Sequence, residues 1–246
     1  MRTLVALKYS PWSEKARWAL DHHRVAYRFE EYVPMLGEPR LRMRVGSPFA
    51  KVSVPVLFED GRVITDSFAI ARRAEEIGGG PSSLFPSERA AAIEAWNRIS
   101  EDALSAGRTL LMGRLRDRPE ARLGSLPGFF PRWLRPLLGP VASMGVAFVA
   151  RKYRASAADL SDCRRRLVGA LDELRAGLNG GEYVFGALTY ADLAMAVVMQ
   201  FVSPVSDVHI ALEPATRDAW RDDALSSSYD DLVGWRDVLY RRHRRA

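Results

Sequence analysis

The chain has 246 residues, enough for one large domain or two smaller ones with a sizeable buried core. Its composition of 48% hydrophobic and 27% charged residues is that of a globular protein. The only cysteine, Cys163, excludes an internal disulfide and a cysteine-rich metal cluster, and it suits a reducing compartment, the cytoplasm. The longest mostly apolar stretch, 137–150, is shorter than the ~20 residues that cross a bilayer, and residues 1–12 lack a signal peptide's apolar run. We therefore expect neither secretion nor a transmembrane helix.

The formal net charge of +6 comes from arginines, which are concentrated in a few clusters from residue 114 onward. Such charge suits nucleic acid, a membrane surface or an anionic ligand. Because no recognition helix or RNA-binding motif accompanies the arginines, we expect a solvated basic face and no nucleic-acid partner. The arginines concerned are Arg114, Arg116, Arg118, Arg132, Arg135, Arg164, Arg165, Arg166 and those of the final RRHRRA.

The first 77 residues alternate between strand and helix patterns. The dipeptide Asp60-Gly61 is typical of a tight hairpin turn, and three glycines at 78–80 end the last helix. The order is therefore βαβ, an irregular link, then ββα. In chain order, the expected elements are a strand at 3–7, a helix at 13–23, a strand at 26–32, a hairpin at 54–66 and a helix at 67–77.

From Pro86 onward the apolar residues follow helical spacing, which predicts an all-helical second half. The segment 78–86, GGGPSSLFP, is rich in Gly, Pro and Ser and stands where the period changes. We therefore expect an α/β domain at 1–78, a linker at 79–86 and an all-α domain at 87–246.

The turn S-P-W-S at 10–13 has the shape of a redox C-x-x-C turn with both sulfurs replaced by hydroxyls. Between a strand and a helix, this turn presents Ser10 at a helix N-terminus, where negative charge is stabilised. The protein supplies no thiolate here, so the anion must come from a ligand.

Four short motifs, in their order and spacing, resemble the cytosolic glutathione transferase superfamily, in a serine-type form like the bacterial members. They match the active-site turn, the strand that begins with a cis-proline, the helix start that holds the γ-glutamyl group, and the capping box of a buried helix. The motifs are SPWSEKARWAL at 10–20, VPVL at 54–57, DSFAI at 66–70 and LTYADLAMA at 188–196. The resemblance covers most of the chain. It implies a thioredoxin-like βαβ-ββα domain followed by a helical-bundle domain, and a homodimer.

The resemblance implies that glutathione, an extended peptide, pairs with the main chain of Val54 beside a cis Pro55. It also implies that Asp66 and Ser67 hold the γ-glutamyl end. A helix start with a hydroxyl suits a carboxylate, and Asp66 can take the ammonium. The alternative is that these two residues only cap a helix.

The chain departs from the family pattern at the contact with the glycyl carboxylate. Ser53 stands where members carry a basic or amide side chain, and Lys51 comes two residues early. Asp66 is also shorter than the commoner Glu or Gln. We expect Lys51 and Ser53 to serve the glycyl end.

The chemistry implied is activation of a thiol that the protein does not own. We expect Ser10 to donate a hydrogen bond to the sulfur of glutathione, the co-substrate, and Ser13 to cap the helix. The thiolate would attack a small apolar electrophile, or glutathione would assist an isomerisation. The rival hypothesis is a non-catalytic glutathione-binding or scaffold protein that retains the fold.

The electrophile is expected between the turn and the first long helix of the second domain, against Trp12, Arg108 and Met112. Tyr9 and Trp18 are expected in the core or the pocket wall, with only Trp12 facing a substrate. The stretch 113–153, which interleaves Phe129, Phe130, Trp133 and Leu134 with arginines, is interpreted as a pocket wall or lid. A plain helix connection and contact with an anionic membrane are the alternatives.

No metal site is expected. His22 and His23 are adjacent at a helix end, where their side chains should diverge, and His209 and His243 have no ligand-spaced partner. Thr189 and Asp192 fit a capping box and are expected to start a helix rather than to take part in chemistry.

Overall fold

The computed structural model describes residues 1–47, 49, 51–124, 135–153 and 159–244. Its N-terminal domain holds a mixed four-stranded sheet in the order β2-β1-β3-β4, with β1 and β2 parallel and the other neighbours antiparallel. The elements are β1 (Arg2–Ala6), α1 (Pro11–His22), β2 (Arg28–Glu31), α2 (Glu38–Arg44), β3 (Val56–Glu59), β4 (Arg62–Thr65) and α3 (Ser67–Ile77). The predicted βαβ-ββα thioredoxin-like domain is confirmed.

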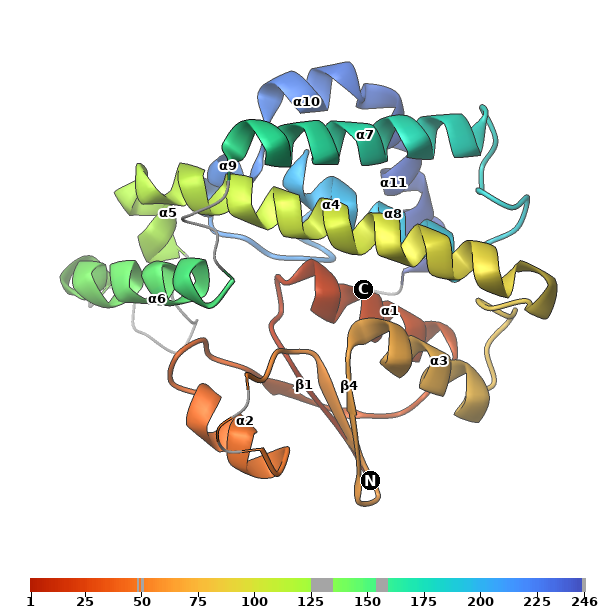
Figure 1. Ribbon diagram of the computed structural model, residues 1–246, viewed down its shortest axis with the longest axis horizontal. Coiled ribbons are helices and arrows are strands. Elements are labelled where there is room, and N and C mark those ends of the chain that lie inside the picture. Colours follow the sequence, from red (N-terminus) through yellow and green to blue (C-terminus); the bar gives the residue numbers. More distant parts are fainter. Residues whose placement is uncertain (48, 50, 125–134, 154–158, 245–246) are drawn as a thin grey trace.

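The sheet and two helices share one apolar core. Leu4 and Leu57 on the central strands and Trp18 and Ile70 on the helices are all fully buried there. Figure 1 shows α1 and α3 between the sheet and the helical domain. Both helices therefore begin at the junction of the two domains, which is where the predicted site residues stand.

The hairpin prediction is confirmed. Asp60 has φ 44° and Gly61 has φ 84°, the two positive values that a tight turn between antiparallel strands requires. The turn returns the chain so that Val56 pairs with Thr65. Residues 54–57 and the start of α3 are thereby held side by side.

Two details of the N-terminal domain differ from expectation. The link between β2 and β3 is not wholly irregular, since it contains the seven-residue helix α2. Helix α1 begins at Pro11 with Ser10 as its N-cap residue, so the prediction that Ser13 caps this helix is wrong. Proline is tolerated in the first turn because the N–H it lacks would have no helical partner. The Ser13 hydroxyl instead accepts a hydrogen bond from the Leu7 N–H at 3.1 Å.

The described residues after Pro86 form helices and no strand, which confirms the helical second domain. Asp192 and Thr189 form the predicted capping box at the start of the buried helix α8. The elements are η1 (Ser87–Arg89), α4 (Ala90–Arg116), α5 (Pro119–Gly124), η2 (Arg135–Leu138), α6 (Gly139–Lys152), α7 (Leu160–Leu178), α8 (Tyr190–Ala196), η4 (Val198–Phe201), α9 (Pro214–Trp220), α10 (Asp223–Ser228) and α11 (Asp230–His243).

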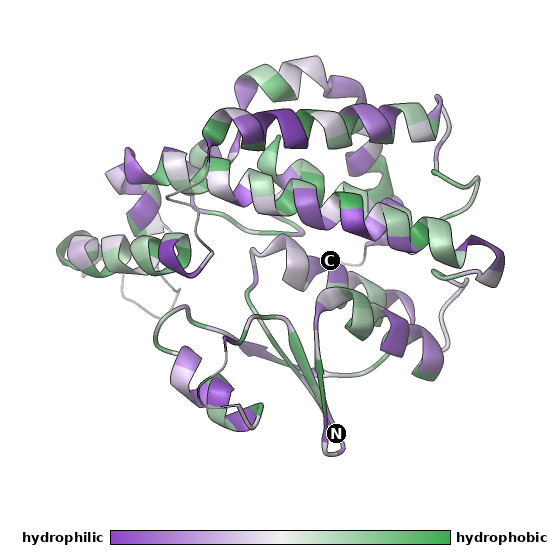
Figure 2. Ribbon diagram, in the orientation of Figure 1, coloured by the Kyte–Doolittle hydropathy of each residue, from purple (hydrophilic) through white to green (hydrophobic). Residues whose placement is uncertain are grey.

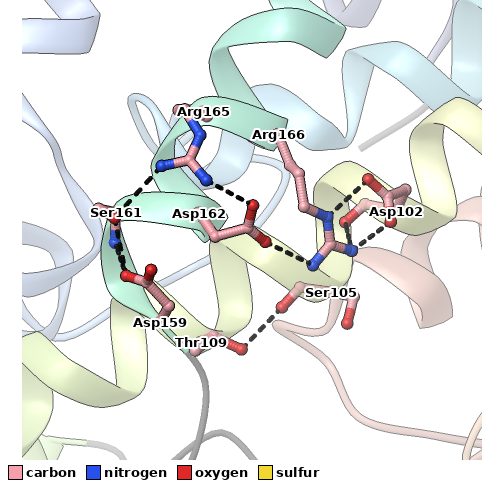
Figure 3. A network of polar contacts seen from close by, with 8 residues as sticks. All are labelled: Asp102, Ser105, Thr109, Asp159, Ser161, Asp162, Arg165 and Arg166. Carbon is pink, nitrogen blue, oxygen red and sulfur yellow. Dashed lines mark hydrogen bonds and ion pairs between the residues drawn. The ribbon is translucent and has the colours of Figure 1, made fainter.

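A network of charged side chains braces the long helix α4 against α7. Figure 3 shows Arg166 of α7 reaching both Asp162 on its own helix and Asp102 on α4, with 2.9 Å between Arg166 Nε and Asp102 Oδ2. In the same view the Thr109 hydroxyl donates to the Ser105 carbonyl within α4. Asp102 of this network directly follows Glu101, which lies at the junction of the two domains.

The C-terminal end of the described chain returns to the N-terminal domain. Figure 1 places it beside α1. Arg244 Nε donates to Glu14 at 2.7 Å, and Arg244 Nη1 donates to Asp21 at 2.7 Å. Both acids lie on α1, so the last described residue helps to hold the helix that begins at Ser10.

Candidate functional site

A cavity of about 1050 Å³ lies at the junction of the two domains. Its walls come from the start of α1, the loop before β3, the start of α3, and from α4 and α6. Nine of the predicted site residues line it: Ser10, Trp12, Ser53, Val54, Pro55, Asp66, Ser67, Arg108 and Met112. Lys51, the tenth, is exposed and stands outside the cavity.

Ser10 occupies the N-cap position of α1 in an extended conformation, with φ −77° and ψ 126°. Its main-chain carbonyl accepts from the Glu14 N–H at 2.9 Å, while its side chain makes no capping hydrogen bond. The hydroxyl is therefore not engaged by the helix, and it lines the cavity at the positive end of the helix dipole.

Tyr9 lies in the cavity wall, which agrees with its expected place in the core or the pocket wall, and it carries a second hydroxyl there. Its ring meets Trp220 edge-on, with 6.1 Å between centroids. Burial, with the charge of Glu31, raises the pKa of Tyr9 to about 12, so the phenol stays protonated at neutral pH. Trp18 lies in the core, fully buried.

The Val54–Pro55 peptide bond is cis, as the motif predicts. Strand β3 begins at the next residue, where Val56 pairs with Val5 of β1. Val54 itself stands before the strand and in the cavity wall. Its main chain is thus placed at the open end of β3, where an extended peptide can pair.

Asp66 and Ser67 play different parts at the start of α3. Asp66 is the N-cap residue with φ 83°, and its Oδ1 accepts from the N–H groups of Phe68 at 2.7 Å and Ala69 at 3.1 Å. The Ser67 side chain is 1% exposed, and its hydroxyl has no hydrogen-bond partner among the described residues. The hydroxyl of Tyr190 lies next to the Ser67 hydroxyl. Burial raises the pKa of the Tyr190 phenol well above its ordinary value. Asp66 therefore caps the helix, and Ser67 brings a hydroxyl without a hydrogen bond to the described residues into the cavity wall.

Glu101 of α4 joins the two domains beneath the turn. Its two carboxylate oxygens accept from Lys15 Nζ at 2.7 Å and from Trp12 Nε1 at 2.6 Å. Lys15 is fully buried, and burial lowers its pKa while the Glu101 charge opposes that shift. The pair orients the Trp12 indole. Sequence reasoning missed it because Lys15 and Glu101 lie 86 residues apart.

Helix α6 closes one side of the cavity. At its end, Lys152 Nζ donates to Glu38 at 2.6 Å and to the Val52 carbonyl, and the Tyr153 hydroxyl donates to Ser53 Oγ at 3.2 Å. Figure 2 shows α6 as mostly apolar with a hydrophilic C-terminal end. The cation beside the Val52–Ser53 segment is therefore Lys152, which the sequence did not suggest. Phe129, Phe130, Trp133 and Leu134 lie outside the described residues.

His22 and His23 do not diverge as expected: their ring centroids are 4.8 Å apart in an edge-on arrangement. His22 Nε2 lies 2.9 Å from the Ser82 carbonyl, and His23 Nε2 lies 3.4 Å from a Glu75 oxygen, so both rings link α1 to its neighbours. Within the described ranges, no three His, Cys, Asp or Glu side chains gather as a metal site would need. No helix there combines the length and apolar character needed to cross a bilayer.

Solved structures with the same architecture cover nearly the whole chain. A glutathione transferase from Methylobacterium radiotolerans in complex with glutathione sulfonate has a TM-score of 0.62 and 19% identity, covering 98% of this chain and 91% of that one. A glutathione transferase from Phanerochaete chrysosporium has a TM-score of 0.64 and 17% identity, covering 100% and 98%. Residues 9–77 match the family model "Glutathione S-transferase, N-terminal domain". The N-terminal domain is therefore a glutathione S-transferase N-terminal domain.

A probable glutathione S-transferase from Solanum tuberosum is 36% identical over 101 residues, which are 40% of this chain and 45% of that protein. The match thus spans less than half the length of this curated superfamily member. The solved structures establish the fold, and the family model establishes the superfamily of the N-terminal domain. The serine-type assignment stays a prediction.

Proposed function

We propose that the protein binds glutathione in its N-terminal domain and activates the thiol as a glutathione transferase. The observation that carries the proposal is that Ser10, Val54 and Ser67, from three separate elements, line a single cavity. The relative from Methylobacterium radiotolerans, whose structure is a complex with glutathione sulfonate, supports the choice of ligand.

In this proposal the main chain of Val54 pairs with the cysteine of glutathione, and the start of α3 receives the γ-glutamyl end. The Ser67 hydroxyl and the adjacent helix N–H groups would donate to the carboxylate. Asp66 would attract the ammonium with the oxygen that does not cap the helix. Ser53, with Lys152 close by and Lys51 farther out, would meet the glycyl end.

The Ser10 hydroxyl would donate a hydrogen bond to the sulfur of glutathione. A free thiol has a pKa near ~8.5, and a hydrogen bond beside a helix N-terminus favours the thiolate. Lowering that pKa by ~2 units corresponds to ~2.7 kcal/mol. The thiolate would then attack an electrophile with an apolar body held against Trp12 and Met112.

Calorimetry with glutathione and turnover of an aromatic halide test the proposal. We expect saturable binding, and in Ser10→Ala a lower rate, a raised apparent pKa of the pH–rate profile and an unchanged glutathione Kd. Tyr9→Phe is the matched variant for the other cavity hydroxyl. If Tyr9→Phe reproduces these effects and Ser10→Ala does not, the thiol donor is Tyr9.

The rival function is glutathione binding without catalysis, favoured by the exposed position of Lys51 and the serine at position 53. Retention on immobilised glutathione without turnover of any electrophile in a broad panel would favour this reading. Absence of glutathione binding would remove both.

The proposal extends to a homodimer, a cytoplasmic location, an absence of metal, and the domain limits 1–78, 79–86 and 87–246. The superfamily resemblance supports the dimer, and the single cysteine suits the reducing compartment. Light scattering tests the homodimer, and metal analysis of the purified protein tests the absence of metal.

A further inference from the structure

Arg108 of α4 lines the cavity with a guanidinium that contacts aromatic rings in place of a carboxylate. Its guanidinium lies between two aromatic rings, 4.6 Å from the Trp12 centroid and 3.7 Å from the Tyr153 centroid. The side chain is half-buried, and its Nε is shielded from solvent and makes no hydrogen bond to the described residues. Among those residues it also has no ion-pair partner.

Two other cations that line the cavity are paired with carboxylates, and a third, Arg122, donates to the Arg116 carbonyl at 2.8 Å. Lys8 pairs with Glu31 at 2.9 Å, and Lys152 pairs with Glu38 at 2.6 Å. Glu101, whose charge acts on Arg108, is already hydrogen-bonded to the buried Lys15 and to the Trp12 indole. Burial lowers the pKa of Arg108, which reflects the cost of holding this charge away from water. Ring stacking offsets part of that cost.

The stacking geometry limits what the guanidinium can still bind. The guanidinium carbon is close enough to the Trp12 and Tyr153 rings for cation–π contact with both, and the N–H donors at the guanidinium edge are left for a ligand. That edge matches a carboxylate, which can accept two parallel hydrogen bonds from it. A neutral aromatic ligand would instead compete with the Trp12 and Tyr153 rings for the guanidinium and would leave its N–H donors unused.

The position of Arg108 relates this edge to the reacting end of the cavity. Trp12 stands two residues after Ser10 in the turn that begins α1, and Met112 lies one turn beyond Arg108 on the same face of α4. A ligand on Arg108 would thus lie between the turn and the apolar wall. The glycyl end of glutathione is expected instead at Ser53, where Lys152 provides a closer cation.

We propose that Arg108 binds a carboxylate of the electrophile, so that the preferred substrates are apolar molecules carrying one carboxylate. This inference rests on the proposed function and names the substrate class for the same cavity. Arg108 is thereby a specificity-determining residue, and it does not take part in activating the thiol.

A pair of aryl chlorides of equal size tests the proposal: 4-chloro-3-nitrobenzoate and 4-chloro-3-nitrobenzamide. In each, the glutathione sulfur forms a bond to the carbon that carries chlorine, and the carbon–chlorine bond breaks. Chloride leaves with the bonding electron pair, and the thiol proton passes to solvent. Dividing each kcat/KM by the uncatalysed rate constant removes the intrinsic difference in reactivity between the two chlorides.

We expect the benzoate-to-benzamide ratio of these normalised values to fall at least tenfold in Arg108→Gln, because the charge and its bidentate edge are both lost. Arg108→Lys keeps the charge without the planar edge, so its benzoate-to-benzamide ratio should lie between those of the unaltered protein and Arg108→Gln. The control is Arg98→Gln, on the same helix, with a side chain that is 68% exposed and 3.7 Å from Glu94. It should keep the ratio of the unaltered protein.

A binding measurement separates this proposal from the proposed function. Calorimetry with the unreactive 3-nitrobenzoate and 3-nitrobenzamide needs no turnover. The unaltered protein should bind the benzoate at least tenfold more tightly, and Arg108→Gln should lose that preference. If glutathione itself fails to bind, the proposed function is wrong, while the nitrobenzoate preference still reports on Arg108.

Three results would overturn the inference. The first is an equal Kd for the two nitro compounds in the unaltered protein, which requires no variant to fold. The second is a benzoate-to-benzamide ratio that does not change in Arg108→Gln. The third is a weaker glutathione Kd in Arg108→Gln with that ratio preserved, which would assign Arg108 to the glycyl carboxylate.

Discussion

Two adjacent residues, Asp66 and Ser67, have the same candidate roles in the sequence, which are helix capping and binding of the γ-glutamyl group. Their hydrogen bonds differ in the folded protein. Asp66 accepts two hydrogen bonds from the first turn of α3, so its replacement removes a helix cap. Ser67 brings a buried hydroxyl that no described residue satisfies. A buried hydroxyl without a partner costs stability, and a ligand that supplies an acceptor recovers that cost.

We expect Ser67→Ala to raise the glutathione Kd by about tenfold or more, because a hydrogen bond to a charged group contributes ~1.5–3 kcal/mol. The free energy of unfolding without ligand should change little, since the Ser67 hydroxyl makes no regular hydrogen bond to the described residues and faces only the Tyr190 hydroxyl. Calorimetry and urea unfolding measure the two quantities. Ser100→Ala is the matched control, because Ser100 also buries an unpartnered hydroxyl but does not line the cavity. Equal effects of the two variants on Kd would contradict this role of Ser67.

At the scale of elements, α4 owes its close approach to η4 to a glycine. A Cβ atom at Gly107 would collide with the ring of Phe201, which is stacked on Trp220 with 5.2 Å between centroids. Both rings line the cavity. The position tolerates no side chain, so the packing of the cavity wall outweighs the helix propensity that any other residue would add.

Gly107→Ala should therefore lower the free energy of unfolding by about 1–3 kcal/mol through overpacking. Gly169→Ala, in the middle of α7, is the control, because a Cβ there meets no atom within 4 Å. It should raise the free energy by up to ~1 kcal/mol through helix propensity. Chemical denaturation of both variants measures the difference, and stabilisation of both would show that Phe201 can move aside at little cost.

The contact between α2 and α6 depends on the charge of Glu38. Burial alone would raise the pKa of this carboxyl, but hydrogen bonds from Lys152, Tyr32 and Arg42 outweigh burial and lower it below the ordinary 4.5. A depressed pKa means that the stabilisation is complete above the unfolded-state value and is lost as the pH falls through the folded-state value. The pair therefore holds α6 on the N-terminal domain at neutral pH and weakens in acid.

We expect Glu38→Gln to reduce the free energy of unfolding at pH 7, and the difference from the unaltered protein to shrink below about pH 4.5. Denaturant unfolding at a series of pH values measures this difference. Glu94→Gln, which alters an exposed pair 3.7 Å from Arg98, should have little effect at any pH. A difference that stays constant from pH 7 to pH 3 would argue against an ionised Glu38.

At the scale of the whole molecule, the two ends of the sequence meet at α1. Arg244 has a side chain that is 3% exposed and pairs with Glu14, which is fully buried. Burial opposes the charge on Arg244, yet Glu14 and Asp21 raise its pKa above the ordinary range. The helix that begins with Ser10 is therefore held partly by a residue at the far end of the chain.

Arg244→Gln should lower the free energy of unfolding by about 3 kcal/mol, because it leaves Glu14 buried with a weaker set of partners. Arg242→Gln is the control from the same tail, where an exposed arginine pairs with Glu182 at 3.0 Å. Its effect should be much smaller. Thermal unfolding at one pH compares the two, and equal shifts would mean that the buried pair adds nothing beyond a surface pair.

Features coded within a few residues could be predicted from the sequence. The Asp60-Gly61 turn, the bounds of α3 and the Thr189–Asp192 capping box follow from local backbone preferences, the cis Val54–Pro55 bond follows from the motif resemblance, and the structure confirms all four. The Ser13 cap failed for a local reason as well. Ser10 and Ser13, three residues apart in the turn, can each start a helix, and the hydrogen bond between the Ser13 hydroxyl and the Leu7 N–H distinguishes them only in the folded protein.

Short motifs and hydrophobic period were enough to predict the glutathione S-transferase type of the N-terminal domain, the order of the two domains and the segments that line the cavity. The distribution of charge in the cavity, in contrast, depends on how the two domains pack. Glu101 under Trp12 and Lys152 against Val52 join residues 89 and 100 apart, and Arg108 between Trp12 and Tyr153 is likewise a contact across elements. Such partners meet only when the domains pack, since the free energy of each contact depends on burial that no local pattern encodes.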